Sequence, residues 1–257
     1  MGTDPIRIFV GSSSRDLPAE MVLEHSIRKN TEAKVEFTWM RAGDPGFDDW
    51  NCLFDLDPKT TQRRWQGPAF SMFRFAVPEL AGFDGHAIYL DSDMLVRGDI
   101  KELWNWLQKG PILCCAPKRL CVSKWDCGRF RVPWWPSIEE MKSWKGVTAS
   151  KGPMKELLTQ HDYYYEHLTP HWNIVDGKGF MPGATRLVHY SNTSTQPWTP
   201  WPEKRKYRTH PNAEMKALWF DTYREATASA LDAGRRPMLL QSPSSSASNA
   251  GKSGRLS

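Results

Sequence analysis

The beginning of the chain alternates strand, turn, helix and strand, and this order restricts the fold more than any other feature of the sequence. Residues 6–10 (IRIFV) form an apolar, β-rich run that predicts a strand. A polar turn at residues 11–14 follows it, and Asp16 and Pro18 are typical of a helix start. Residues 35–39 alternate as a second strand. Because strands joined through a helix run parallel with both faces covered, we predict an α/β fold with a mostly parallel central sheet flanked by helices.

The rest of the chain continues the mixture of helices and strands. Residues 41–68 are rich in Gly, Pro and Asp and predict loops. From residue 234 the chain turns to Ser, Gly and Asn, so we predict one domain over residues 1–233 and a disordered tail over 234–257. Strands are expected at 87–90, 111–115 and 186–190, and helices at 70–77 (stopped by Pro78), 99–110, 137–144, 153–159 and 212–231.

Two aspartates directly follow the apolar strand predicted at residues 87–90. Asp91 and Asp93 are separated by one serine, and the apolar residues 94–96 come next. Carboxylates so placed on a turn beyond a strand can face one crevice, and oxygen ligands suit Mg²⁺ and Mn²⁺. A D-x-D tripeptide often occurs by chance. Here, however, two acids between apolar runs are costly to desolvate without a cation, which favours a metal site.

The region around this acidic pair resembles a known enzyme family. Residues 89–96 (YLDSDMLV), with Asp99, Ile100 and Leu103 after them, look like the core of glycosyltransferase family 8, which includes glycogenin and lipopolysaccharide galactosyltransferases. Residues 70–75 (FSMFRF), the pair Trp172-Asn173, and residues 187–190 (LVHY) followed by Pro197-Trp198 resemble further family segments in the same order. The resemblance covers about residues 6–201 and implies a single GT-A-type domain, similar to other nucleotide-diphospho-sugar transferases.

The resemblance implies a function and a role for each matching residue. Family members transfer a sugar from a nucleotide-diphosphate sugar, chiefly a UDP-sugar, to a carbohydrate or glycoconjugate acceptor with retention of configuration. They depend on Mn²⁺ or Mg²⁺. The implied metal ligands are Asp91, Asp93 and His189, and Asp91 also contacts the ribose. The resemblance also implies that Arg74 lies near the donor diphosphate and that Trp198 lies over the donor. The implied base and ribose pocket is lined by Val10, Gly11 and Ser12. The implied catalytic residues are Arg74, Asp91 and Asp93.

The sequence departs from the family pattern at three places. Gln196 stands where the family has a lysine before Pro-Trp, so Lys204, Arg205 or Lys206 would have to meet the phosphate charge. The family's Asn-x-Gly strand is approximated only by residues 121–126. Its D-Q-D motif has only a loose counterpart at residues 160–162.

Composition and the chain ends narrow the range of partners and compartments. Lys and Arg exceed Asp and Glu by 34 to 29, an excess that suits anionic ligands but is too small to indicate nucleic acid. The N-terminus lacks the apolar run of a signal peptide, and no stretch approaches the roughly 20 apolar residues of a membrane span. The five cysteines form no zinc-type pattern, which predicts free, buried thiols in a reducing, cytoplasmic setting.

Several alternative interpretations remain open at this stage. The acidic pair is also compatible with a Mg²⁺-dependent phosphohydrolase that uses Asp91 as nucleophile, or with a non-catalytic nucleotide- or carbohydrate-binding module. His189 on an apolar strand could be an ordinary core histidine. The tryptophans, 13 in all, can fill cores or stack on sugars, and Trp134-Trp135 is an example of either use.

Overall fold

A six-stranded mixed sheet forms the centre of the molecule. The computed structural model describes residues 4–50, 54–56, 63–65, 70–115, 119–144, 152–198 and 209–234. The strand order is β2-β1-β5-β8-β7-β9, in which β8 alone runs against its neighbours β5 and β7. The predicted mostly parallel sheet is therefore confirmed. The strands are β1 (Ile6–Ser13), β2 (Val35–Ala42), β5 (His86–Asp91), β7 (Ile112–Cys114), β8 (Val122–Asp126) and β9 (Tyr164–Tyr165).

The opening strand–helix–strand unit forms as the sequence predicts, but its strands are longer. β1 pairs in parallel with β2 from Ile6 opposite Val35 to Ser13 opposite Ala42. The helix α1 (Leu17–Lys29) makes the crossover between them. The polar residues after Val10 thus belong to the strand rather than to a turn, because their backbone groups are satisfied by the ladder to β2.

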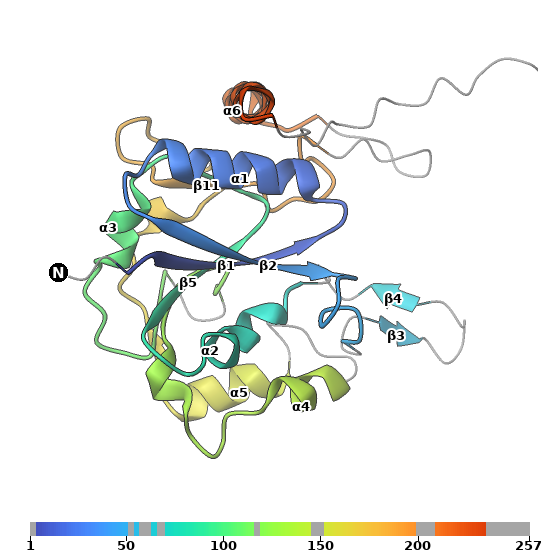
Figure 1. Ribbon diagram of the computed structural model, residues 1–257, viewed down its shortest axis with the longest axis vertical. Helices are drawn as coiled ribbons and strands as arrows, with labels where there is room; N and C mark the ends of the chain where they lie inside the picture. The colour runs from blue at the N-terminus through green and yellow to red at the C-terminus, as the bar shows by residue number, and fades with distance from the viewer. Residues whose placement is uncertain are drawn as a thin grey trace, which may run out of the picture.

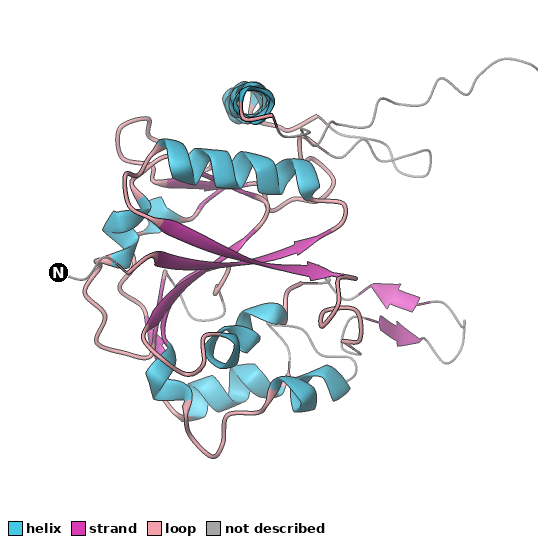
Figure 2. Ribbon diagram, viewed as in Figure 1, coloured by secondary structure: helices cyan, strands magenta, loops and turns pink. Residues whose placement is uncertain are grey.

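Helices cover both faces of this sheet (Figure 1, Figure 2). On one face lies α1, with α6 (Ala213–Asp232) outside it and joined to it by an ion pair of 2.6 Å between Lys29 and Glu225. On the other face lie α2 (Val77–Leu80), α4 (Ile138–Ser143) and α5 (Pro153–Gln160). The short helix α3 (Ile100–Trp104) begins at Asp99, whose carboxylate accepts from the Lys101 backbone N–H.

A second, three-stranded sheet decides where distant parts of the chain meet. It consists of β10 (Ile174–Val175), β11 (Leu187–His189) and β6 (Met94–Val96), in the order β10-β11-β6. β11 runs antiparallel to β6, with His189 opposite Met94. The Tyr190 N–H donates to the Asp93 carbonyl at 2.8 Å and extends this pairing by one residue. The C-terminal half of the chain is thereby fixed to the turn that carries the acidic pair.

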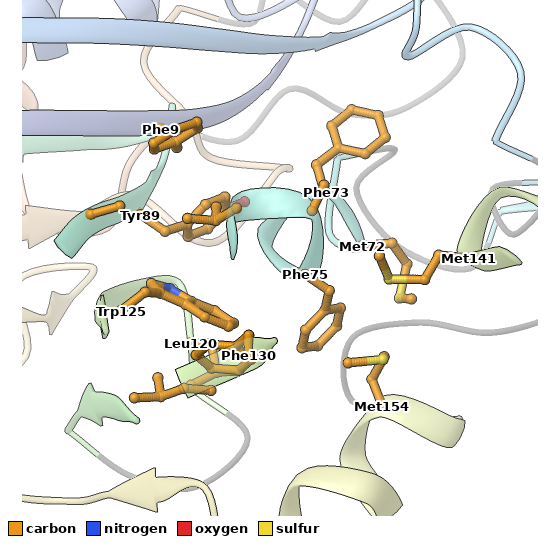
Figure 3. Packing of buried hydrophobic residues seen from close by; sticks show 14 of the residues in the cluster. Phe9, Met72, Phe73, Phe75, Tyr89, Leu120, Trp125, Phe130, Met141 and Met154 are labelled. Carbon is orange, nitrogen blue, oxygen red and sulfur yellow. The ribbon is translucent and has the colours of Figure 1, made fainter. Parts of the chain in front are cut away.

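Aromatic side chains fill the space between the main sheet and α2, α4 and α5 (Figure 3). Trp125 of β8 is wholly buried, and its indole N–H donates to the Ser123 hydroxyl at 2.9 Å. Trp135 belongs to this core, and Trp134 packs against it. Burial of aromatic surface is a large favourable contribution to folding, and a donor that finds a partner avoids the desolvation penalty. Packing also accounts for Trp135 and for the wholly buried Trp50, Trp172 and Trp219, although the indole N–H groups of Trp135 and Trp172 are buried without a hydrogen-bond partner.

Three predicted elements differ from the structure. The region 41–68 contains the end of β2 and a short antiparallel hairpin, β3 (Phe54–Leu56) and β4 (Arg63–Trp65), in place of loops alone. Pro78 does not stop a helix but lies in the first turn of α2, where its missing N–H has no intrahelical acceptor to lose. The helix expected to reach Gly110 ends at Trp104. Leu107, which was expected on its buried face, lies beyond the helix and is 68% exposed.

The cysteines within the described ranges are free thiols. Cys114, Cys121 and Cys127 are buried and Cys115 is partly buried, whereas Cys52 and residues 235–257 lie outside the described residues. Burial raises the pKa of the Cys127 thiol to about 12. Among the described helices, none has the length and apolar content that crossing a membrane would need.

Capping of α6 gives a first test of the packing. The Asn212 side chain accepts from the Met215 N–H at 3.2 Å, and α6 buries Met215 and Trp219 against the rest of the molecule. We expect Asn212→Ala to lower the free energy of unfolding by about 1 kcal/mol, whereas Asn212→Gly should cost only a few tenths. Urea unfolding of the two variants checks this. Equal losses in the two variants would contradict the capping role.

Candidate metal centre

The acidic pair lies on a turn that is fixed by backbone hydrogen bonds on two sides. Asp91 is the last residue of β5 and pairs with Gly11 of β1. The Ser92 N–H donates to the Gly11 carbonyl at 2.9 Å, and the Asp91 N–H donates to the Cys121 carbonyl at 3.1 Å. Asp93 then precedes β6. Neighbouring strands on both sides thus determine the directions of the two carboxylates.

The structure brings His189 to this pair. One candidate ligand atom from each of Asp91, Asp93 and His189 lies within 4.8 Å of the others, and each residue is 6–7% exposed. His189 Nε2 lies 3.2 Å from Asp93 Oδ1, yet this carboxylate oxygen is buried and makes no hydrogen bond. A buried oxygen without a donor is costly, and a cation between it and the imidazole would satisfy it. Two carboxylates and one imidazole suit a divalent ion such as Mn²⁺ or Mg²⁺.

Arg74 contacts Asp91 from a segment that precedes it in the sequence. It lies on the 3-10 helix Phe73–Ala76 and is buried. One of its terminal nitrogens is 3.1 Å from Asp91 Oδ1 and 3.3 Å from Oδ2. Burial opposes the charge of this guanidinium, but Asp91 together with Tyr89 and Cys121 outweighs burial and raises the pKa of Arg74. Arg74 therefore supplies fixed positive charge beside Asp91.

Tyr89 is a further site residue, which the sequence predicts only as part of a strand. Its hydroxyl donates to Asp91 Oδ1 at 2.7 Å, and its ring lies 5.1 Å below the Arg74 guanidinium. Side chains two apart on a strand share one face, so the spacing from Asp91 was the available signal. Gly11 makes room for this contact, because a Cβ on Gly11 would overlap the Tyr89 hydroxyl.

Burial and charge act in opposite directions on these groups. Burial raises the pKa of the Asp91 carboxyl and the neighbouring Asp93 raises it further, while Arg74 lowers it. Burial alone would lower the pKa of His189, but Asp93 together with Cys121 reverses this and raises the pKa well above the usual value. Arg74 and a protonated His189 therefore balance the two carboxylates, and a bound cation would take the place of the proton on His189 Nε2.

Two amide side chains hold the other two candidate ligands. Gln196 Nε2 donates to Asp93 Oδ2 at 3.1 Å and to the Tyr190 carbonyl at 2.9 Å. Asn173 Oδ1 lies 3.0 Å from His189 Nδ1. The sequence alone marks Gln196 only as a departure from the family pattern and Asn173 only as half of a Trp-Asn pair.

The residues predicted for the nucleotide pocket lie at the end of β1, next to the acidic turn. Val10 and Ser12 have no exposed surface, and Val10 packs in the hydrophobic core. Gly11 pairs with Asp91. Their contact with a nucleotide stays a prediction.

Trp198 is buried at the same edge of the sheet, between α1 and α6. Its ring stacks on Trp219 at 5.4 Å, and its indole N–H donates to Asp16 Oδ1 at 3.2 Å. The other oxygen of Asp16 accepts from the Ser13 hydroxyl at 2.7 Å, so this carboxylate stands at the start of α1 without capping it. Trp198 is thus anchored by both helices, and its predicted place over a donor is untested.

Other predicted contacts fall elsewhere. His161 and Asp162, offered as counterparts of the D-Q-D motif, follow α5 and precede β9, whose register with β7 places them at the edge of the sheet opposite Asp91. Trp134 stacks on His161 at 4.0 Å and lies there too, away from the acidic pair. Lys204, Arg205 and Lys206 lie outside the described residues.

Comparison with known sequences gives limited information. No protein-family model matches the chain. Protein CDI from Arabidopsis thaliana is 35% identical over 115 residues, which are 43% of this chain and 40% of that protein. The chain thus spans less than half of the length of this curated relative.

Comparison with solved structures is more informative. The galactosyltransferase LgtC, solved in complex with donor and acceptor sugar analogs, matches with a TM-score of 0.55 at 13% identity, over 86% of this chain and 96% of LgtC. The glycosyltransferase GlyE of Streptococcus pneumoniae TIGR4 matches at 0.53 and 11% identity, over 91% of this chain and 65% of GlyE. The bifunctional enzyme WbbM matches at 0.51 and 12%, over 92% of this chain and 52% of WbbM.

This chain has a GT-A-type fold. The predicted fold class is confirmed, while membership of glycosyltransferase family 8 stays a prediction. At identities of 11–13% the likeness concerns the fold alone.

The contact between Gly11 and Tyr89 predicts a coupled pair of substitutions. Gly11→Ala should lower the free energy of unfolding by about 1–3 kcal/mol, because the new methyl group meets the Tyr89 hydroxyl. Tyr89→Phe removes that hydroxyl, so the same Gly11 substitution should cost less in its background. Urea unfolding of the four proteins in a double-mutant cycle measures the coupling, expected at about 1 kcal/mol. Strictly additive losses would show that the two groups do not meet.

Asp16 predicts a pH effect on stability. Burial raises the pKa of its carboxyl to about 6, against which the Ser13 hydrogen bond acts. Because the folded protein binds this proton more tightly than the unfolded chain, the free energy of unfolding falls as pH rises from about 4 to about 6. Asp16→Asn cannot ionise and should be more stable than wild type at pH 7.5, by up to about 3 kcal/mol, with little gain at pH 4. Urea unfolding at both pH values checks this; the same difference at both would be inconsistent with it.

Proposed function

We propose that the protein is a metal-dependent glycosyltransferase. It would transfer a sugar from a nucleotide-diphosphate sugar, a UDP-sugar first, to a carbohydrate or glycoconjugate acceptor with retention of configuration. The observation that carries this proposal is the convergence of Asp91, Asp93 and His189 at the carboxyl end of β5, in a GT-A-type fold. Ligands of open α/β sheets bind beyond such strand ends.

Each residue of the candidate metal centre has a role in this proposal. Asp91, Asp93 and His189 would hold a divalent cation, Mn²⁺ or Mg²⁺, through two oxygens and one nitrogen. When bound, such an ion neutralises charge that develops on a leaving diphosphate. Arg74 keeps a permanent positive charge against Asp91. It would add charge-assisted hydrogen bonds near the diphosphate.

The donor would lie along the end of β1. Val10, Gly11 and Ser12 would line the base and ribose pocket, with Asp91 facing the ribose and Trp198 closing the donor site. Support comes from their position, since Gly11 pairs with Asp91 and the Trp198 ring lies at the start of α1. LgtC, a protein of similar fold, was solved with donor and acceptor sugar analogs.

A thermal-shift panel of nucleotide sugars, each with and without Mn²⁺, tests the proposal directly. Ligands that bind the folded state raise the melting temperature with concentration over Kd. The expected result is Mn²⁺-dependent stabilisation by UDP-sugars together with slow donor hydrolysis. Stabilisation by UDP and Mn²⁺ without hydrolysis of any donor would indicate a binding module. Turnover of p-nitrophenyl phosphate without nucleotide sugar would indicate a phosphohydrolase.

Asp93→Ala is the decisive variant. It should reduce turnover by at least about 100-fold, because losing about 3 kcal/mol of charge stabilisation corresponds to roughly that factor. The metal-free variant should melt at or slightly above the wild-type temperature, since Asp93 Oδ1 is buried without a hydrogen bond. Asp48→Ala, which removes an exposed carboxylate from the segment 43–50, is the matched control. Wild-type turnover by Asp93→Ala at saturating Mn²⁺ would refute the assignment.

A further inference from the structure

The amide of Asn173 joins two groups beside the candidate metal centre. Its Oδ1 lies 3.0 Å from His189 Nδ1, and its Nδ2 donates to the Cys121 sulfur at 3.3 Å. Asn173 follows the 3-10 helix Pro170–Trp172, and Trp172 is wholly buried. The backbone that carries this amide is therefore anchored in the core.

This arrangement fixes which nitrogen of His189 faces the cation position. A carbonyl oxygen can only accept, so His189 Nδ1 must carry the proton that is shared with Asn173. A cation would therefore displace the proton on Nε2, the nitrogen 3.2 Å from Asp93 Oδ1, and would find the lone pair of the imidazole there. An outer partner on the other ring nitrogen is the usual way in which proteins orient a metal-binding histidine.

Gln196 does the equivalent for Asp93. It is 5% exposed, and its Nε2 donates to Asp93 Oδ2 and to the Tyr190 carbonyl. Oδ2 is thereby occupied, while Oδ1 is left buried and free of hydrogen bonds on the side of His189 Nε2. Each amide thus directs one atom of its partner toward the same position.

We propose that Asn173 and Gln196 are positioning residues that preassemble the metal centre, so that the free protein binds a divalent cation before any nucleotide arrives. This inference rests on the proposed function, because it assumes that Asp91, Asp93 and His189 hold the ion. Both amides are neutral, so they orient the ligands without cancelling the negative charge that attracts the cation. Neither residue would touch the ion itself.

Mn²⁺ titration of the full-length chain, followed by the EPR signal of free Mn²⁺ with no nucleotide present, tests the inference. Wild type should bind one Mn²⁺. Asn173→Ala and Gln196→Leu should each weaken binding by about 10- to 100-fold, the usual effect of losing an outer partner. Thermal melts without Mn²⁺ confirm that each variant folds.

Two further variants separate positioning from packing. Asn173→Asp keeps an acceptor for His189 Nδ1, so it should restore Mn²⁺ affinity to within about threefold of wild type. Cys121→Ala removes the sulfur beside Asn173 Nδ2 and His189 but leaves the Asn173 acceptor in place, so it should also bind within about threefold. If Asn173→Asp binds as weakly as Asn173→Ala, or if Asn173→Ala and Gln196→Leu bind like wild type, the positioning role is wrong.

The titration also distinguishes this inference from the proposed function. If wild type binds Mn²⁺ only after UDP is added, preassembly is overturned while the metal-dependent transferase stands. If wild type binds no Mn²⁺ with or without UDP, the metal centre itself is refuted, and the roles of both amides fall with it.

Discussion

The antiparallel pairing of β11 with β6 is the contact on which the site depends. It joins residues that are almost a hundred positions apart, and it places His189 opposite Met94, one residue from Asp93. The hydrogen bond from the Tyr190 N–H to the Asp93 carbonyl continues the pairing on the acidic turn itself. Strand register allows no intermediate positions, since a slip by one residue would turn the imidazole to the opposite face. The distance between His189 and Asp93 is therefore set by backbone pairing.

Burying two carboxylates together is unfavourable, and the surrounding residues compensate Asp91 with more hydrogen bonds than Asp93. Asp91 is well supplied, because Arg74 and Tyr89 both donate to it. Asp93 receives a hydrogen bond from Gln196 on one oxygen only. Most buried polar atoms have a hydrogen-bond partner, whereas Asp93 Oδ1 has none and faces His189 Nε2 at 3.2 Å, a geometry that a cation between them would satisfy. The two aspartates therefore differ in how far the protein itself satisfies their oxygens.

The sequence could predict the parts of this site that local chemistry determines. The strand before Asp91 and the unit formed by β1, α1 and β2 follow from apolar periodicity, and the resemblance placed His189 with the acids. The outer partners could not be predicted in the same way. In the sequence, Gln196 is only the residue that replaces the family's lysine, and its hydrogen bond to Asp93 becomes visible only in the folded structure. Tyr89 is also indistinguishable in sequence from the apolar residues of its strand. Likewise, the prediction that Pro78 stops a helix is wrong, because its position within the first turn of α2 depends on tertiary packing.

The aromatic core fixes the positions of the side chains that contact Asp91. Arg74 is flanked in sequence by Phe73 and Phe75, both of which are buried almost completely in the cluster of Figure 3. In a 3-10 helix successive side chains point about 120° apart, so two anchored phenylalanines leave a single direction for the arginine between them. Tyr89 belongs to the same cluster and turns only its hydroxyl toward Asp91. Protein cores are close-packed and resist small displacements. The Arg74 guanidinium and the Tyr89 hydroxyl are attached to this aromatic core, so they keep their positions when no ligand is bound.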